Sequence, residues 1–278
     1  MKENILQKIF KANKPIIGAL HFSPMLGYEG FTDKETILKK ALSDLKAFEK
    51  GGVNGIIIEN NYDLPHKIKV GAETIAMMTL FGCEIIKRTK LPVGVSVLWN
   101  DYKAALAIAK VIKAKFIRVP VFVDNVRTDF GEIYGDSRNV IEYRKSINAE
   151  KIALFTDIQV KHAEMLNKNK LLIVSAKQAI EAGSDCIILT GRWTGDAPNL
   201  EKLKKARNAV SDFPIILGSG VSKENVTELF EYADGAIVST SLKEGENIVG
   251  ERNVKPFQVS INLVKVKEFM KQLKKNDR

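Results

Sequence analysis

The chain has 278 residues, of which 45% are hydrophobic and 27% charged, a composition typical of globular proteins rather than disordered or fibrous chains. Lysine and arginine total 43 against 33 acidic residues, which gives a net charge of +10. This charge is consistent with binding to nucleic acid, to an anionic membrane or to phosphorylated ligands, and also with an ordinary solvated surface. The longest uncharged stretch, Pro15 to Tyr28, contains polar residues and is shorter than the roughly 20 apolar residues of a membrane-spanning helix. The N-terminus lacks the apolar core and cleavage site of a secretory signal, so we predict a cytoplasmic protein.

Short apolar runs recur along the chain, and each is followed by a polar loop and a segment of helical spacing. The predicted strands are Pro15–His21, Asn54–Glu59, Pro92–Leu98, Lys115–Val121, Lys151–Ile158, Asp185–Thr190, Pro214–Gly218 and Gly235–Ser239. Each run is apolar almost throughout, as expected for parallel strands that are covered on both faces. The predicted helices are Lys34–Lys50, Glu73–Arg88, Tyr102–Lys113, Ser137–Ser146, Leu172–Ala182, Leu200–Val210, Lys223–Phe230 and Val254–Leu273.

This regular alternation predicts an α/β fold made of one domain. The strand–helix units follow one another without a linker rich in Pro, Gly or Ser, which favours a single (β/α)8 TIM barrel over about residues 15–245 and a basic C-terminal helix over about 254–274. A doubly wound open sheet is the alternative. It would normally carry a glycine-rich phosphate turn after its first strand, and here that strand ends in His21-Phe22-Ser23-Pro24.

In a barrel, the active site lies at the C-terminal ends of the strands, so the fold prediction selects candidate residues. The acid–base candidates are His21, Glu59, Arg118, Asp157, Lys161 and His162. A carboxylate at the end of a buried strand is poorly solvated and either finds a partner or shifts its pKa. For Arg118 the alternative is a structural ion pair with Glu59 or Asp157. Lys161 fits a Schiff-base lysine, a phosphate ligand or an ordinary solvated lysine.

Short motifs rich in glycine or hydroxyl residues lie at the ends of the last two predicted strands and indicate an anion pocket. Glycines in Gly218-Ser219-Gly220 let the backbone approach an anion, and a helix starting near Ser222 would direct free N–H groups toward it. Ser239-Thr240-Ser241 and the cationic Lys243 complete this pocket, whereas the alternative is a pair of ordinary tight turns. The predicted substrate-binding and phosphate-binding residues are Asn100, Thr190, Gly191, Gly218, Ser219, Gly220, Ser239 and Thr240.

No cofactor is predicted. His21, Glu59, Asp157 and His162 are metal-ligand types, but no HxH or HxxxH spacing supports a divalent metal, which stays an alternative. The two cysteines share no CxxC spacing and are interpreted as buried apolar residues. Walker loops and nucleic-acid readout motifs are absent, so we expect no nucleic-acid partner. Barrels of this size often associate through their outer helices, so we expect a homo-oligomer.

An ordered set of short motifs extends from about Pro15 to Lys243. It comprises Gly18-Ala19-Leu20-His21 with Pro24 and Gly27, Glu59-Asn60 with Asp63 and Pro65, Asn100-Asp101, Phe116-Ile117-Arg118, Thr128-Asp129 with Gly131 and Gly135, Asp157 with Lys161-His162, Thr190-Gly191, Thr194-Gly195, Gly218-Ser219-Gly220-Val221 with Asn225, and Asp234-Gly235 with Thr240 and Lys243. In these residues the sequence resembles the BtpA family, also described as membrane-complex or photosystem I biogenesis proteins. The resemblance implies a TIM barrel and, for some members, a role in building or stabilising photosystem I. Four positions depart from the family pattern, namely Tyr62, Pro120, Phe130 and Ser239.

Two functional hypotheses follow. The first is a cytoplasmic enzyme that acts on a small phosphorylated metabolite, a sugar phosphate or nucleotide, by isomerase, lyase or hydrolase chemistry at the barrel mouth. The second is a non-catalytic assembly factor for a membrane protein complex, whose lysine-rich final helix contacts an anionic membrane at its periphery. We favour the enzyme, because an assembly factor has no evident need for so many ionisable groups at a barrel mouth.

Overall fold

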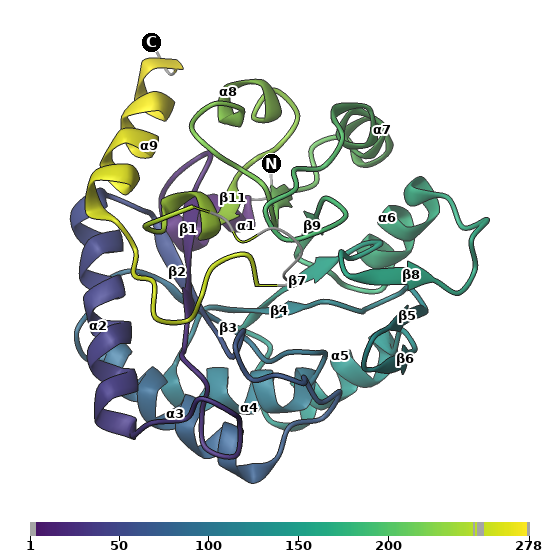
Figure 1. Ribbon diagram of the computed structural model, residues 1–278. Coiled ribbons are helices and arrows are strands. Elements are labelled where there is room, and N and C mark those ends of the chain that lie inside the picture. The colour runs from purple at the N-terminus through teal and green to yellow at the C-terminus, as the bar shows by residue number, and fades with distance from the viewer. Residues whose placement is uncertain (1–3, 247, 249–252, 277–278) are drawn as a thin grey trace.

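The computed structural model describes residues 4–246, 248 and 253–276, and their fold is a closed barrel of eight parallel strands (Figure 1). In chain order the strands are β1 (Ile16–His21), β2 (Gly55–Glu59), β3 (Val93–Ser96), β4 (Phe116–Val119), β7 (Ala153–Asp157), β9 (Cys186–Leu189), β10 (Ile215–Leu217) and β11 (Ala236–Val238). Each pairs with the next in the barrel, and β11 closes it by pairing with β1. The prediction of a (β/α)8 barrel is therefore confirmed, and the open-sheet alternative is wrong.

Helices surround the barrel in the order expected from the sequence (Figure 1). They are α2 (Lys34–Gly51), α3 (Ala72–Ile86), α4 (Tyr102–Ile112), α5 (Ser137–Ser146), α6 (Leu172–Glu181), α7 (Leu200–Val210), α8 (Val226–Leu229) and α9 (Leu263–Asn276), and a 3₁₀ turn η1 (Thr240–Leu242) follows β11. In α2, the Asp33 side chain caps the first turn, and Gly52 ends the helix with a φ of 91°. Within the described part of the chain, no helix combines the length and apolar character that a membrane crossing needs.

Two helices differ from their predicted bounds by more than two residues. The predicted helix Lys223–Phe230 shrinks to the single turn of α8. The predicted C-terminal helix starts not at Val254 but at Leu263, where the side chain of Asn262 accepts hydrogen bonds from the next amides. Residues 253–262 instead cross the barrel mouth as an irregular segment, because Pro256 lacks the N–H that a helix interior needs.

A short N-terminal helix, α1 (Ile5–Phe10), closes the opposite end of the barrel and was not predicted. Its Leu6 and Phe10 are buried in the barrel interior, and the Phe10 ring lies edge-on to Phe116 at a centroid distance of 5.5 Å. Gly55 of β2 makes room for it, since a Cβ there would lie 2.6 Å from the Phe10 ring. The helix therefore fills the end of the barrel away from the predicted site.

A small antiparallel sheet beside the mouth was also missed. Its strands are β5 (Val126–Thr128), β6 (Gly131–Ile133) and β8 (Ala163–Met165), with β5 in the middle. The sheet packs on a separate apolar cluster that includes Trp99 and Val160. Because β8 begins directly after Lys161-His162, the sheet anchors these two site residues from their C-terminal side.

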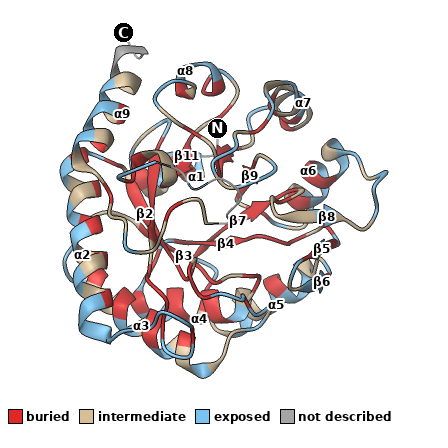
Figure 2. Cartoon of the chain, viewed as in Figure 1, coloured by how far each residue is buried: buried red, intermediate tan, exposed pale blue. Residues whose placement is uncertain are grey.

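The barrel strands are buried on both faces (Figure 2), and side-chain alternation divides the core into two parts. One face packs outward against the helices, and the other fills the barrel interior. The interior residues of the strands include Ile17, Ile57, Phe116, Phe155, Ile188, Ile216 and Ile237. Two residues beyond these positions, or four residues in β1, the chain reaches the inward positions at the mouth.

Candidate functional site

The inward positions at the mouth carry polar residues or glycine instead of the apolar side chains below them. Side chains in a strand alternate between its two faces, so the residue two positions after an interior residue also points inward. In chain order these residues are Glu59, Arg118, Asp157, Thr190, Gly218 and Ser239, and in β1 the inward residue at the mouth is His21, four positions after Ile17. All seven positions were predicted site residues. The period of two is thus the structural reason that strand ends predict this site.

Arg118 is the centre of a buried ionic cluster. Its Nε and one Nη each lie 2.8 Å from an oxygen of Asp157, and its other Nη lies 3.6 Å from Oε1 of Glu59. All three residues are at most 6% exposed. Burial raises the pKa of the Asp157 carboxyl, but the charge and two hydrogen bonds of Arg118 oppose this. We therefore treat Arg118 and Asp157 as an ionised bidentate pair.

Glu59 joins this cluster to His21, whose Nε2 lies 3.4 Å from Oε2 of Glu59. Burial opposes ionisation of Glu59, but the hydrogen bond from His21 and the charge of Arg118 outweigh it and lower the pKa of Glu59. Burial and the positive charge of Lys243 lower the pKa of His21 to about 4, so this imidazole is neutral at pH 7. We assign its proton to Nε2, facing Glu59, which leaves the buried Nδ1 as an acceptor with no protein partner in the described structure.

Lys161 and His162 follow β7 and form the next part of the site. The backbone N–H of Lys161 donates to Oγ1 of Thr190 at 2.9 Å, which fixes the loop over the barrel. Burial and the charge of Arg118 lower the pKa of Lys161 to about 8. Burial also lowers the pKa of His162 to about 4, and its Nε2 lies 2.8 Å from Oγ1 of Thr194.

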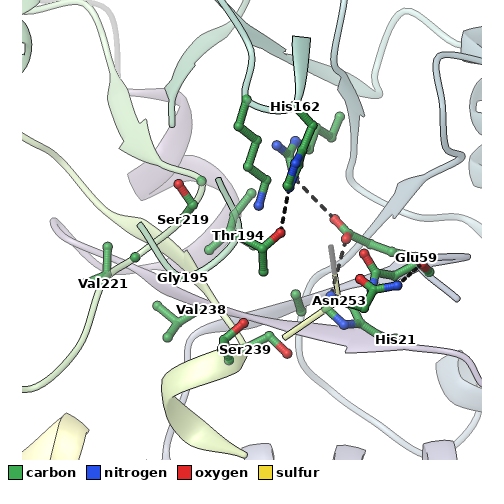
Figure 3. Close-up of a pocket in the computed structure, with 18 of the residues that line it drawn as sticks. His21, Glu59, His162, Thr194, Gly195, Ser219, Val221, Val238, Ser239 and Asn253 are labelled. Carbon is green, nitrogen blue, oxygen red and sulfur yellow. Dashed lines mark hydrogen bonds and ion pairs between the residues drawn. The ribbon is translucent and has the colours of Figure 1, made fainter. Parts of the chain in front are cut away.

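These groups open into a cavity of about 340 Å³ at the mouth. Figure 3 shows Glu59, His21 and His162 on one side and Ser219, Val221 and Ser239 on the other. Of the predicted residues, those that line the cavity are His21, Glu59, Arg118, Lys161, His162, Gly218, Ser219, Gly220, Ser239 and Thr240. Side chains with acid–base chemistry therefore face the turns predicted to bind an anion.

The turn after β10 has a different local structure from the one expected. The Ser219 hydroxyl accepts from Gly191 N–H and donates to the Asp196 carbonyl, so it is already satisfied within the protein. Gly220 has a φ of 67°, and a Cβ there would lie 2.0 Å from the Ala197 nitrogen. Ser222 does not cap a long helix, because α8 has only 4 residues and its N-cap is Asn225. The glycines thus serve close packing of the loop that follows β9.

Unsatisfied polar groups nevertheless line this wall of the cavity. Among the hydrogen bonds of the described residues, the backbone N–H groups of Gly220 and Val221 have no acceptor. The Ser239 hydroxyl is buried and also lacks a partner in the described structure. Three residues that line the cavity therefore carry hydrogen-bond donors without an acceptor among the described residues, which suits an anionic ligand.

Other predicted residues do not line this cavity. Asn100 holds the backbone of Val121, with its Oδ1 2.8 Å from Val121 N and its Nδ2 3.0 Å from Val121 O. Thr190 and Gly191 line a neighbouring cavity of about 540 Å³ instead. Asp157 is covered by Arg118. Lys243, the cation expected beside the anion pocket, is buried elsewhere and donates to the Tyr62 hydroxyl at 2.8 Å.

Several lining residues were not predicted as site residues. His66 lies in the loop after β2 and faces the Phe130 ring edge-on at 5.3 Å. Its place near the Asp63 and Pro65 motif was a signal that sequence reasoning passed over. Asn253 belongs to the segment that crosses the mouth and exchanges two hydrogen bonds with Asn61, of 2.7 and 3.1 Å. These residues are 192 positions apart, so no local pattern indicates their contact.

Among the described residues, no group of three or more His, Cys, Asp or Glu side chains is arranged to bind a metal ion. Glu59 and Asp157 are already paired with Arg118. Cys186 is buried in the barrel interior, where burial raises the pKa of its thiol, and Cys83 is half-buried on α3.

A model of the BtpA family matches residues 12–274. This chain belongs to the BtpA family. It is 36% identical over 269 residues to the "Photosystem I biogenesis protein BtpA" of Synechocystis, covering 96% of this chain and 92% of that protein. A protein of Archaeoglobus fulgidus is 37% identical over 240 residues, covering 86% of this chain and 95% of the relative. The BtpA-family resemblance seen in the sequence is thus confirmed.

Solved structures that resemble this BtpA-family chain share its fold at low sequence identity. Tryptophan synthase from M. tuberculosis aligns with a TM-score of 0.58 and 13% identity, covering 97% of this chain and 98% of that one. Phosphoribosyl anthranilate isomerase from Thermococcus kodakaraensis aligns with a TM-score of 0.54 and 12% identity, covering 94% and 98%. These likenesses show the barrel fold alone.

Proposed function

We propose that this BtpA-family protein is a cytoplasmic enzyme that moves protons on a small phosphorylated metabolite, a sugar phosphate or nucleotide, at its barrel mouth. The observation that carries the proposal is the buried group of Glu59, His21, Arg118 and Lys161 on the wall of a 340 Å³ cavity. Burying charged groups is unfavourable, and replacing such a cluster with packed apolar residues is often neutral or stabilising. Because stability does not explain four ionisable groups in this position, we infer that they bind or act on a ligand.

Each group has a role that its environment suits. Glu59 is ionised and buried, and its Oε1, which lies 3.6 Å from Arg118 but accepts no hydrogen bond in the described structure, is the proton acceptor. Neutral His21 carries a proton on Nε2 and an open acceptor at Nδ1, as a proton relay requires. Arg118 stabilises negative charge that develops on the substrate. Asp157 holds Arg118 in place and is a positioning residue, although the sequence suggested an acid.

The phosphate would occupy the opposite wall. The N–H groups of Gly220 and Val221 and the Ser239 hydroxyl belong to residues that line the cavity, and no acceptor among the described residues uses them. The cavity volume is near the lower end of the range of small-molecule sites, roughly 300–1,000 Å³. A compact metabolite with one phosphate group matches this size better than a large cofactor does.

Two measurements test the proposal. Isothermal titration with inorganic phosphate is expected to show one site that Ser239→Val weakens, since valine lacks the hydroxyl, and Ser239→Ala, which removes the hydroxyl without adding bulk, is expected to weaken it to the same extent. Thermal-shift screening of sugar phosphates and nucleotides would then find a ligand that raises the unfolding midpoint, and Glu59→Gln would abolish its conversion. The matched control is Glu132→Gln, an exposed carboxylate paired with Arg127 away from the cavity. No phosphate binding, or full activity in Glu59→Gln, would contradict the proposal.

A second candidate function comes from the name of the Synechocystis relative, which is a biogenesis protein for a membrane complex. The α9 helix presents Lys267 and Lys271 to solvent, whereas Lys265 donates to the Lys243 carbonyl. Each basic residue near an anionic surface adds roughly 1 kcal/mol of attraction. Salt-sensitive sedimentation with phosphatidylserine vesicles that is lost in Lys267→Glu/Lys271→Glu would support this function. No binding at low salt would exclude membrane contact through α9.

A further inference from the structure

Lys161 differs from two other lysines with largely covered side chains, Lys170 and Lys243, in having no partner among the described residues. Lys170 pairs with Asp124 at 2.7 Å, and Lys243 donates to Tyr62 at 2.8 Å. Within the described structure, the Lys161 ammonium makes neither an ion pair nor a hydrogen bond, although it lines the 340 Å³ cavity beside Glu59. An unpaired lysine in such a position is either a ligand-binding cation or a nucleophile.

The backbone around Lys161 is held on both sides, so its side chain leaves the loop from a fixed point. Its own N–H donates to Thr190, and the N–H of His162 donates to the Arg192 carbonyl at 3.2 Å. Strand β8 begins at the following residue, Ala163. A reactive group needs this kind of positioning, which an ordinary surface lysine lacks.

Its electrostatic surroundings favour the neutral amine. Burial acts first, and the neighbouring guanidinium of Arg118 adds to it, so that the pKa of Lys161 falls to about 8. At pH 7.5 an amine with this pKa is roughly one quarter neutral, against about one part in a thousand for an unperturbed lysine. Desolvation next to a second cation is a recognised way of activating a lysine as a nucleophile. A lysine that only binds phosphate gains nothing from losing its charge.

We propose that Lys161 is a covalent nucleophile, which forms a Schiff base with the carbonyl carbon of a phosphorylated aldehyde or ketone. The proposal rests on the proposed function, because the anion wall is what brings the carbonyl to Lys161. The neutral amine attacks the carbonyl carbon, a C–N bond forms, and the carbonyl π pair moves to oxygen. Protonation and loss of water then leave the iminium, so one proton is taken up from solvent and one water is released.

The same cluster supplies the next step. An iminium withdraws electrons and weakens the adjacent C–H bond, and the carboxylate of Glu59 is the ionised base beside it. Proton removal by Glu59 sends the C–H pair toward the iminium nitrogen and gives an enamine. Return of a proton to the opposite face of the same carbon regenerates the iminium with that carbon inverted. Hydrolysis then takes up one water, breaks the C–N bond and releases one proton, which restores the carbonyl and the neutral amine of Lys161, so the net reaction is an epimerisation next to the carbonyl. This narrows the substrate class from phosphorylated metabolites in general to those with an aldehyde or ketone carbonyl.

Reductive methylation with formaldehyde and cyanoborohydride tests the nucleophile in the unmodified full chain. At pH 7.5 peptide mapping by mass spectrometry is expected to show Lys161 labelled at least about tenfold faster than the exposed, ion-paired Lys223, because more of its amine is neutral. Inorganic phosphate is expected to slow labelling of Lys161 but not of Lys223. Labelling of Lys161 no faster than Lys223 would overturn the proposal.

Trapping with phosphorylated probes tests the substrate class. With cyanoborohydride, dihydroxyacetone phosphate is expected to give one adduct, located on Lys161, while glycerol 3-phosphate gives none and dihydroxyacetone reacts more slowly. Lys161→Arg would abolish the adduct, and Lys202→Arg, a half-buried lysine of the neighbouring cavity, would retain it. Phosphate binding without an adduct at Lys161 would overturn the Schiff base alone. Absence of phosphate binding would overturn the proposed function as well.

Discussion

Replacing Arg118 by methionine removes a guanidinium that pairs with both carboxylates of the cluster. In the native protein, Arg118 makes two hydrogen bonds of 2.8 Å to Asp157 and lies 3.6 Å from Glu59. Methionine keeps much of the volume but leaves two carboxylates, each at most 4% exposed, without a guanidinium. Removing one partner of a buried pair costs about 3–5 kcal/mol of the free energy of unfolding. We expect Arg118→Met to lose this amount in urea unfolding at pH 7.5.

The loss should depend on pH in a definite direction. Without Arg118, burial raises the pKa of both carboxyls above their unfolded values, so the folded state binds more protons than the unfolded state near neutral pH. Stability of the variant then falls as pH rises, and the deficit against the native protein is larger at pH 7.5 than at pH 5. Arg118→Met/Asp157→Asn removes one uncompensated charge and should recover about 1–3 kcal/mol.

Arg127→Met is the matched control. Arg127 also bonds to a carboxylate, at 2.7 Å, but it is 64% exposed and its partner Glu132 is 38% exposed. Exposed pairs contribute about 0.2–1 kcal/mol, so we expect a small loss that does not change with pH. Equal losses in the two variants, or a deficit for Arg118→Met that is the same at pH 5 and pH 7.5, would refute the reasoning about buried charge.

Three further variants test other parts of the structure. Phe10→Ala should cost about 3–5 kcal/mol in urea unfolding, because it empties the contact with Phe116 at the closed end of the barrel, while phosphate binding stays unchanged. Burial lowers the pKa of His21 from 6.5 to about 4, so the folded state holds this imidazole neutral where the unfolded chain would protonate it. The free energy of unfolding therefore falls as the pH drops from 6.5 toward 4. His21→Gln removes this titration and should reduce the loss of stability between pH 7 and pH 5 by about 2 kcal/mol. Gly220→Ala forces a Cβ against Ala197 at a φ of 67° and should lower the thermal midpoint and phosphate affinity together, and an unchanged midpoint would contradict the packing argument.

The barrel could be predicted because parallel strands covered on both faces leave continuous apolar runs. The ends of the same runs indicated the candidate site, because side chains alternate between the two faces of a strand. Glu59 therefore points inward like Ile57, and Arg118 points inward like Phe116, but both lie at the mouth. Helix starts were less accurate where local signals conflicted. The final helix was extended back to Val254 through Pro256, although the cap at Asn262 marks its start.

Features built from few residues or from distant contacts left too little pattern to predict. The α1 helix is 6 residues long, and its place in the barrel depends on contacts with strands that come much later in the chain. The three strands of the small sheet have 3 residues each. Glycine at position 220 was correctly placed at the mouth, but its steric cause is the loop near Ala197, which no local motif reveals.

The apolar interior of the barrel contributes stability, whereas the polar mouth contributes little, and this difference helps to compare the two functional hypotheses. Below the mouth the interior is filled by residues such as Phe155 and Ile188, which stabilise the barrel without any charge. One step higher, Asp157 and Arg118 replace this packing with an ion pair that adds little net stability. A membrane-assembly surface on α9 would be served equally well by an apolar mouth. The reaction proposed for the cavity gives the charge cluster a use, whereas contact of α9 with a membrane complex does not.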